Sequence, residues 1–257
     1  MKIKQVLEAL ERFAPLPLQE SWDNAGLQIG LTEAEVSGAL LCLDVTEQIV
    51  REAVERGCNL VVSHHPLLFR GLKQVADLND VQRTVRKAIQ NDICVISMHT
   101  NLDNAFGGVN FKIAERLGAT AIEPMGDEQH PGQWVMATFE HPMASRVFVE
   151  VVKRAMEAER VAYNELLQRS VQRVAICGGA GDFLLDAAVA KGADAFLTGE
   201  MHYHQYFGYE QKIQICVIGH YESEHYTKEL LRDIIEDACQ GVPCHLAETN
   251  TNPILYL

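Results

Sequence analysis

Apolar and polar positions in the first part of the chain follow the pattern of helices and short buried strands in turn. Residues 3–14 carry apolar side chains at the spacing of one helix face, and the polar stretch 21–30 is typical of a loop. Short, continuous apolar runs then alternate with amphipathic segments, which favours a mostly parallel sheet covered by helices on both faces. The predicted strands are 38–45, 59–63 and 93–98, and the predicted helices are 47–56 and 80–91.

The same order of strands and helices returns in the second part of the chain. Residues 126–132 are polar, contain glycine and proline, and are the best candidate for a linker. We therefore expect an N-terminal α/β half at 1–125 and a C-terminal α/β half at 126–257, which together form one compact unit. A strand after residue 132 and a last strand near the C-terminus are expected. The other predicted strands are 172–177, 194–198 and 213–218, and the predicted helices are 145–157, 182–191, 202–209 and 223–238.

The two halves resemble copies of one another. A shift of 135 positions lays residues 38–65 over 172–200 once the extra Gln172 is set aside, and a second shift, of 121, aligns two later strand ends. The matched pairs are Cys42 with Cys177, Gly57 with Gly192, His65 with Glu200, His99 with His220 and Asp103 with Glu224. Two unrelated βα units can agree by chance, because the motif is common. The shared register of a helix-ending glycine and of polar strand ends favours internal duplication.

Composition and charge exclude several classes of protein. The formal net charge is -13 and the pI is about 5.2, which argues against nucleic-acid binding because such proteins neutralise phosphates with basic patches. The N-terminus lacks the apolar core of a secretory signal, and no apolar run is long enough to span a bilayer. The seven cysteines form no C-x-x-C pair, which fits a reducing compartment. We therefore expect a cytoplasmic protein with neither membrane nor nucleic acid as partner.

Polar residues that can bind metals follow four of the predicted strands. The segments are SHHP at 63–66, MHTNLD at 98–103, TGEMHYH at 198–204 and GHYESE at 219–224. Ligands of open α/β sheets bind beyond the carboxyl ends of the strands. A single histidine at such a place more often caps a helix or fills a core, but four ends with the same chemistry are difficult to explain that way. Imidazole and carboxylate groups suit divalent Zn, Mn, Fe, Co or Ni.

The spacing within these segments allows the side chains to converge. His64 and His65 would point to opposite sides of a continuing strand, so both reach one centre only if the chain turns, and Pro66 favours a turn. His220 and Glu224 are four residues apart and can meet where a strand end runs into a helix. Two ions held in such a cluster polarise a phosphoryl or carbonyl oxygen and supply hydroxide at neutral pH.

Several motifs in order resemble one known family. The segments SWDNAGLQIG, SHHPLLFRGLK, HTNLDNAFGGVN, ICGGAG, FLTGEMHYH and IGHYESE are similar to those of the NIF-three-like dinuclear-metal family. Its bacterial members are often labelled GTP cyclohydrolase 1 type 2 homologues. The resemblance covers the whole chain and implies two similar α/β halves with the metal site between them, in a ring-shaped homohexamer. It also implies that two divalent ions are held by His64, His65, Asp103, His220 and Glu224.

Three further features keep two interpretations each. His99 is either a ligand or a partner that orients Asp103. Glu200 is either a base or water holder that faces the metals, or a carboxylate at a helix start that the helix dipole favours. The glycine-rich segment 177–182 either places amides near a phosphate or forms a tight turn between strand and helix, and the incomplete motif favours the turn.

Two functional hypotheses follow. The first is a metal-dependent hydrolase that acts on a nucleotide or other phosphorylated small molecule, similar to GTP cyclohydrolase 1 type 2 by resemblance. Bound water is then the nucleophile and Glu200 the catalytic residue. The second is a non-enzymatic metal-binding or regulatory protein. Ligands at strand ends indicate where chemistry happens and do not identify the substrate.

Overall fold

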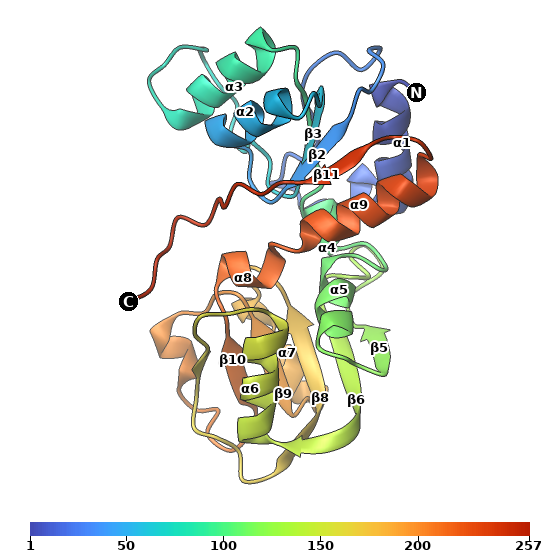
Figure 1. The fold of residues 1–257 in the computed structure, drawn as a ribbon. Coiled ribbons are helices and arrows are strands. Elements are labelled where there is room, and N and C mark those ends of the chain that lie inside the picture. The colour runs from blue at the N-terminus through green and yellow to red at the C-terminus, as the bar shows by residue number, and fades with distance from the viewer. The chain divides into compact units, whose positions relative to one another are not determined.

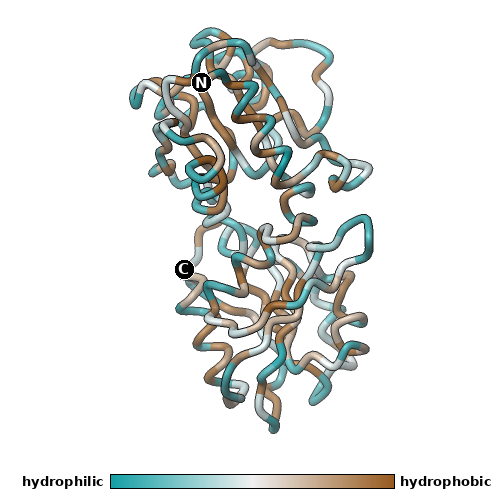
Figure 2. Tube along the Cα trace, turned by 90° about the vertical axis from the view of Figure 1, so that its right-hand side faces the viewer, coloured by the Kyte–Doolittle hydropathy of each residue, from teal (hydrophilic) through white to brown (hydrophobic).

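The computed structural model describes residues 1–257, and the chain divides into two compact units. Unit 1 contains residues 1–105 and 225–255, and unit 2 contains residues 106–224 and 256–257. No helix combines the length and the apolar character that crossing a lipid bilayer requires. In Figure 2, apolar segments run through the middle of each unit, where its sheet lies, and hydrophilic segments dominate the outer turns.

The units have different bounds from the two halves predicted from the linker pattern. The C-terminal helix and strand pack in unit 1 because the strand adds to its sheet and the helix covers it. The division between residues 125 and 126 therefore stays a prediction about the duplicated sequence, whereas packing joins the N- and C-terminal parts of the chain in unit 1.

Unit 1 is built around a five-stranded sheet. Its strands β2, β3, β4 and β11 are parallel, and β1 is antiparallel at one edge. Every residue of β2, β3 and β4 is buried, which explains why these strands are continuous apolar runs. The order across the sheet is β1 (Gly26–Ile29), β4 (Cys94–Ser97), β3 (Leu60–Ser63), β2 (Ala39–Cys42) and β11 (Cys244–Leu246).

Helices cover both faces of this sheet (Figure 1). On one face, α2 (Glu47–Glu55) and α3 (Asp80–Gln90) bury their apolar sides against the strands. On the other, α9 (Thr227–Ala238) packs on β2 and β11 and against α1 (Ile3–Phe13). The short elements η1 (Leu16–Leu18) and α4 (Thr100–Asp103) lie together beside the end of β4.

Unit 2 contains a six-stranded mixed sheet. Its centre, β8, β9 and β10, is parallel, and β5, β6 and β7 flank it with antiparallel pairing. The order is β5 (Ala121–Pro124), β6 (Val135–Ala144), β8 (Ser170–Cys177), β9 (Ala195–Thr198), β10 (Gln214–Val217) and β7 (Ala162–Tyr163). The helical elements are α5 (Val109–Arg116), α6 (Ser145–Ala155), η2 (Asp182–Leu184), α7 (Leu185–Ala190), η3 (Tyr203–Tyr206) and α8 (His220–Glu224).

The strand registers of the two units agree with internal duplication. β2 and β3 correspond to β8 and β9 at the predicted shift of 135, since β3 begins at residue 60 and β9 at residue 195. β4 corresponds to β10 from Cys94 to Gln214, which makes the second shift 120 rather than 121. In both units a helix begins three residues after this strand ends. Thr100, and not His99, therefore corresponds to His220.

Most predicted elements are present, with differences at their ends. The loop predicted at 21–30 contains the short edge strand β1. The helix predicted at 182–191 begins as the 3-10 turn η2, and the one predicted at 202–209 is the 3-10 turn η3. The long helix predicted at 223–238 begins at Thr227, because α8 ends at Glu224 where the chain passes from unit 2 to unit 1. Helix α5 and strand β5 were not predicted.

Candidate metal centre

His64 and His65 follow β3 directly, and the chain turns there as their convergence requires. The hydroxyl of Ser63 donates to the carbonyl oxygen of His65 at 2.8 Å, which folds the chain back at the strand end. The ring centroids of His64 and His65 are 4.9 Å apart. Both imidazoles are therefore directed into one region at the carboxyl edge of the unit 1 sheet.

The His64 ring is fully buried and held by the main chain. Its Nδ1 lies 2.8 Å from the carbonyl oxygen of Met98, which follows β4. Because a carbonyl oxygen only accepts, Nδ1 carries the hydrogen, and Nε2 has the lone pair that binds a metal. The same Nε2 lies 3.6 Å from Oδ1 of Asp103, so these two predicted ligands approach one another from different strand ends.

The His65 ring is oriented by a carboxylate. Its Nδ1 lies 2.7 Å from Oδ1 of Asp44, which follows β2. The hydroxyl of Thr251 donates to the other oxygen of Asp44 at 2.8 Å. Burial raises the pKa of Asp44, but the hydrogen bonds and positive charge offered by His65 outweigh it and lower the pKa below its ordinary value. The ionised carboxylate therefore fixes the hydrogen on Nδ1 and leaves Nε2 as the ligand atom.

His99 has the same arrangement with a second carboxylate. Its Nδ1 lies 2.7 Å from Oδ1 of Asp23, and Asp23 also accepts hydrogen bonds from the main chain and the hydroxyl of Thr100. Burial raises the pKa of Asp23, but the contacts with His99 and Thr100 outweigh it and lower the pKa to about 2. Asp23 lies in the segment 21–30, which the sequence predicts to be a loop. This segment therefore helps to position the His99 ring.

The three imidazoles form a group with metal-binding geometry. One ring nitrogen of each of His64, His65 and His99 lies within 4.8 Å of the others. In each ring Nδ1 is bound to an oxygen acceptor, which is the arrangement found in metal-ligating histidines because it fixes the ring and its tautomer. Of the two interpretations of His99, the geometry favours a ligand, since its ring lies beside the other two and its hydrogen bond goes to Asp23.

Two large aromatic side chains border this group. The centroids of Trp22 and Phe69 lie 6.1 and 6.3 Å from that of His99, and 5.8 Å from each other. Both are exposed, at 58% and 45%. They give the imidazole group an apolar rim that can contact the flat part of a ligand.

Unit 2 holds a second group of candidate ligands at the start of α8. His220 lies between two carboxylates, with Nδ1 3.1 Å from Oε1 of Glu200 and Nε2 3.1 Å from Oε2 of Glu224. Two ligand atoms on one ion with bonds of about 2.1 Å lie about 3 Å apart, so the His220–Glu224 spacing fits a shared ion. Glu200 repeats the role that Asp44 has for His65.

Glycine at the strand ends of unit 2 allows this helix to approach closely. A Cβ at Gly179, whose φ is +58°, would lie 2.5 Å from Oε1 of Glu224. A Cβ at Gly199 would lie 2.5 Å from the hydroxyl oxygen of Ser223 and 2.7 Å from the carbonyl oxygen of Gly179. Only glycine fits at these two positions, and the absence of side chains there sets the place of α8 and its ligands.

The glycine-rich segment 177–182 forms a tight turn between strand and helix. Its N–H groups donate to side chains of the protein: Gly178 to Asn110, Gly179 to Ser223 and Gly181 to Thr198, at 2.8, 2.9 and 3.0 Å. Groups bound in this way are not offered to a phosphate. The interpretation as a structural turn is the one that the hydrogen bonds support.

Comparison with known proteins identifies the family. A family model described as Duf34/NIF3 (NGG1p interacting factor 3) matches residues 1–253. The chain belongs to this family. A Duf34/NIF3 relative from Lactococcus lactis is 34% identical over 98% of each chain, and one from Campylobacter jejuni is 31% identical over the full length of both. Both relatives carry the name GTP cyclohydrolase 1 type 2 homolog.

Solved structures of family members have the same fold. A hypothetical protein from Staphylococcus aureus superposes with a TM-score of 0.91 at 30% identity, covering 100% of this chain and 99% of the other. A Bacillus cereus protein related to NIF3 gives a TM-score of 0.89 at 23% identity, again covering 100% and 99% of the two chains. The α/β fold predicted from the sequence is confirmed.

The sequence did not single out the groups that orient the imidazoles. Asp44 lies near the end of a predicted strand. The residue that matches it at the shift of 135 is Gly179, which has no side chain, so the alignment of the two copies did not point to Asp44. Asp23 stood in a stretch interpreted as loop. Among the remaining histidines, His202 lies 3.6 Å from Asp182, outside both ligand groups. The partners of the imidazoles are distant in sequence, so only the fold brings them together.

Proposed function

We propose that this Duf34/NIF3 protein binds two divalent metal ions and uses them as a hydrolase on a nucleotide or other phosphorylated small molecule. The proposed ligands are three imidazoles and two carboxylates: His64, His65, Asp103, His220 and Glu224. His99 is a further ligand candidate. The ions are Zn, Mn, Fe, Co or Ni, since all accept this ligand set.

One observation carries this proposal: the imidazoles are oriented before any metal is bound. In each ring of the unit 1 group, the Nδ1–H donates to an oxygen that can only accept. These oxygens belong to Met98, Asp44 and Asp23. A histidine in a core also bonds its buried nitrogens, whereas a metal ligand keeps one nitrogen for the ion and almost always donates the other in this way. Three such rings with nitrogens within 4.8 Å of one another are best explained by a cation.

The covalent chain places part of each proposed ligand group close to a point where it passes between the units. The chain leaves unit 1 between Ala105 and Phe106 and returns between Glu224 and His225. Asp103 is therefore three residues from unit 2, at most about 11 Å along an extended chain, and Glu224 is bonded directly to unit 1. Each proposed ligand group thus includes a residue close in sequence to a point where the chain crosses.

The chemistry follows from the proposed ions and the groups around them. Two bound ions would polarise a phosphoryl or carbonyl oxygen and lower the pKa of bound water. Glu200 is the proposed base: one of its oxygens faces His220, its side chain is 57% exposed, and its second oxygen can accept a proton from the attacking water. Trp22 and Phe69 offer apolar surface for a flat group such as a base.

The relatives' name suggests which substrate to try first. Because relatives are named GTP cyclohydrolase 1 type 2 homologs, GTP heads the panel. Hydrolysis of both C8–N bonds of GTP opens the ring and releases formate, whereas phosphate hydrolysis releases inorganic phosphate, so the two products distinguish the two reactions.

We further propose a cytoplasmic homohexamer with metals facing an interior cavity. All seven cysteines are unpaired thiols, and six of them are buried, which favours a reducing compartment. The hexamer rests on resemblance to the family. Size-exclusion chromatography with light scattering tests it, with a mass of about six chains expected and a monomer contradicting it.

The function is tested by following formate and phosphate release from GTP, other nucleotides and a generic phosphate ester. Protein loaded with Mn or Zn is compared with chelated protein. We expect turnover that chelation abolishes and metal restores. Glu200→Gln is expected to keep its metal and to lower kcat by about 100-fold or more. His141→Ala, at an exposed position, is the control and is expected to change nothing.

The outcomes separate the hypotheses. Bound metal without turnover on any substrate would replace the hydrolase with the non-enzymatic metal-binding or regulatory protein. Turnover that survives chelation would contradict a metal-dependent mechanism. Full activity of Glu200→Gln would remove the base and leave Glu200 as a group that orients His220.

A further inference from the structure

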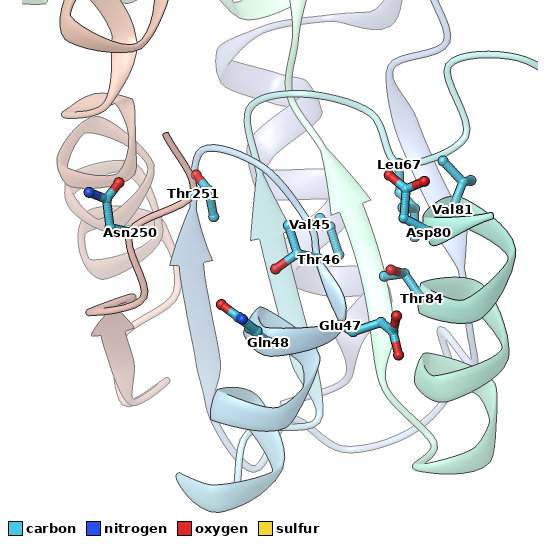
Figure 3. A pocket seen from close by; sticks show the side chains of 10 residues that line it. All are labelled: Val45, Thr46, Glu47, Gln48, Leu67, Asp80, Val81, Thr84, Asn250 and Thr251. Carbon is cyan, nitrogen blue, oxygen red and sulfur yellow. The ribbon is translucent and has the colours of Figure 1, made fainter. Parts of the chain in front are cut away.

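A cavity of about 320 Å³ lies beside the carboxyl ends of β2 and β3 in unit 1 (Figure 3). Val45, which follows β2, and Leu67, which follows β3, are buried and give it an apolar floor. Side chains from the first turns of α2 and α3 and from the C-terminal segment surround the same space (Figure 3). This volume is at the lower end of the range of about 300–1,000 Å³ that is usual for small-molecule sites.

One wall residue has a hydroxyl that forms no hydrogen bond within the protein. Thr84 is 2% exposed, and its side chain points from α3 toward α2, into the cavity (Figure 3). No protein group forms a hydrogen bond with its hydroxyl. This hydroxyl can therefore donate to, or accept from, a polar group that enters the cavity.

Two helix starts supply further donors to the same cavity. Thr46 caps α2 by accepting from the N–H of Ile49 at 3.3 Å, and Asn79 caps α3 by accepting from the N–H of Gln82 at 2.9 Å. These caps leave the first N–H groups of both helices without helical partners. Both helix starts belong to the cavity wall and offer hydrogen bonds to an oxygen atom there.

The charges on the wall decide which kind of oxygen fits. Of the ten residues that line the cavity, Glu47 and Asp80 carry carboxylates and none carries a cation. Glu47 is paired with Arg83 at 2.9 Å, which lies outside the lining. A phosphate would meet the carboxylates of Glu47 and Asp80 and find no cation in the lining to pair with, whereas a neutral hydroxyl donates to a carboxylate and accepts from an N–H at once.

We propose that this cavity binds a neutral, hydroxyl-rich ring such as a pentose. Adjacent hydroxyls of the ring bind the Thr84 hydroxyl, the helix-start N–H groups and the carboxylates of Glu47 and Asp80. The carbon face of the ring packs on Val45 and Leu67. The site needs no metal ion, so it stands whether or not the proposed hydrolase is correct.

The cavity is nevertheless connected to the imidazole group. Thr251, at its edge, donates to Asp44, and Asp44 accepts from His65. A ring in this cavity therefore lies two hydrogen bonds away from a proposed metal ligand, at the edge of the sheet where α/β proteins bind their substrates.

The test is an NMR titration of the full-length, chelated protein with D-ribose, followed through main-chain amides. A ligand of this size is expected to bind with a Kd of about 1–10 mM. We expect saturable shifts at Gln48 and Val81, at the two helix starts. Thr84→Val, which has the same shape without the hydroxyl, should weaken binding about three- to tenfold, and Thr84→Ser should restore it.

Two controls make the result decisive. Thr120→Val removes an exposed hydroxyl in unit 2 and is expected to leave binding unchanged. If Thr84→Val does not fold, Glu47→Ala, at the half-exposed rim, replaces it and is expected to weaken binding. Absence of saturable shifts, unchanged binding in the wall variants, or tighter binding of ribose 5-phosphate than of ribose would each overturn the proposal.

Discussion

The two units share a strand pattern but differ in the residues that follow the strands. In unit 1 the strands end in Asp44, His64 and His65, and these side chains converge. At the matching positions of unit 2 stand Gly179, Gly199 and Glu200. Unit 1 therefore carries its proposed imidazole ligands at the strand ends, where hydrogen bonds orient the rings. Unit 2 has glycine at two of the three positions, which allows α8 to approach, and its proposed ligands lie on that helix.

This difference shows how two copies of a fold can present different groups at matching strand ends. One copy carries imidazoles there, and the other carries glycine beside a helix that bears a histidine and a carboxylate. Both copies nevertheless pair a histidine with a carboxylate. The pairs are His65 with Asp44 and His220 with Glu200. Four substitutions test the comparison, from the largest expected effect to the smallest.

The largest effect is expected from filling a bare strand end in unit 2. In Gly199→Ala the added Cβ meets the hydroxyl oxygen of Ser223 and two carbonyl oxygens, two of these atoms belonging to main chain that cannot move aside. We expect the free energy of unfolding to fall by about 3 kcal/mol in urea denaturation. Gly71→Ala, where an added Cβ meets nothing within 4 Å, is the control. Equal effects of the two substitutions would show that α8 does not depend on close approach.

A second effect concerns acid stability through Asp23 in unit 1. Its side chain is buried and its folded pKa, about 2, lies below the unfolded value of about 3.9. The ionised carboxylate therefore stabilises the fold above about pH 4, and this contribution, about 2 kcal/mol, is lost as the pH falls through about 2. The stability difference between the chelated wild type and Asp23→Asn should shrink accordingly. A difference that does not depend on pH would contradict the assignment.

The orienting carboxylate of His65 should affect metal affinity. In Asp44→Asn the amide oxygen still accepts from His65, but the charge is lost, so we expect affinity to fall by about tenfold. Competition with a chelating dye measures it. The matched control is Asp127→Asn, which alters another His–Asp pair, with His130, away from both ligand groups. If both substitutions weaken metal binding alike, the orienting role of Asp44 is wrong.

The smallest effect is expected one hydrogen bond farther from the ring. Thr251→Val removes the hydroxyl that donates to the Asp44 carboxylate. Because this hydroxyl does not contact the His65 ring itself, we expect metal affinity to fall by only about threefold. Thr251→Ser should restore the wild-type value in the same dye competition. A loss as large as that of Asp44→Asn would mean that Thr251 acts otherwise than through Asp44.

Much of the fold was predictable because its signals are local. Continuous apolar runs gave β2, β3, β4, β9 and β10 to within three residues at each end, since buried parallel strands contain little else. The edge strand β1 was missed because a strand with one exposed edge and flanking glycines has the composition of a loop. The predicted second shift of 121 differs by one residue from the shift of 120 that the strand registers give. It rests on the chemical similarity of His99 and His220, which do not match in register.

The site was predictable only where its residues lie at strand ends. His64, His65 and His220 follow apolar strands, so their place in the fold could be inferred from the sequence. Asp23 and Asp44 act by orienting rings that lie 76 and 21 residues away. No local pattern encodes such pairs, and the same holds for the Gly199 contact with Ser223, which depends on three-dimensional packing.

The central claim is that ligands from both units hold one pair of ions, and metal content per chain tests it most directly. Protein loaded with Mn or Zn and desalted is measured by elemental analysis as wild type, Glu224→Ala and the exposed control His141→Ala. The account predicts about two ions per chain in the wild type and the control, and one or fewer in Glu224→Ala. Undiminished metal in Glu224→Ala, or no metal in the wild type, would contradict it.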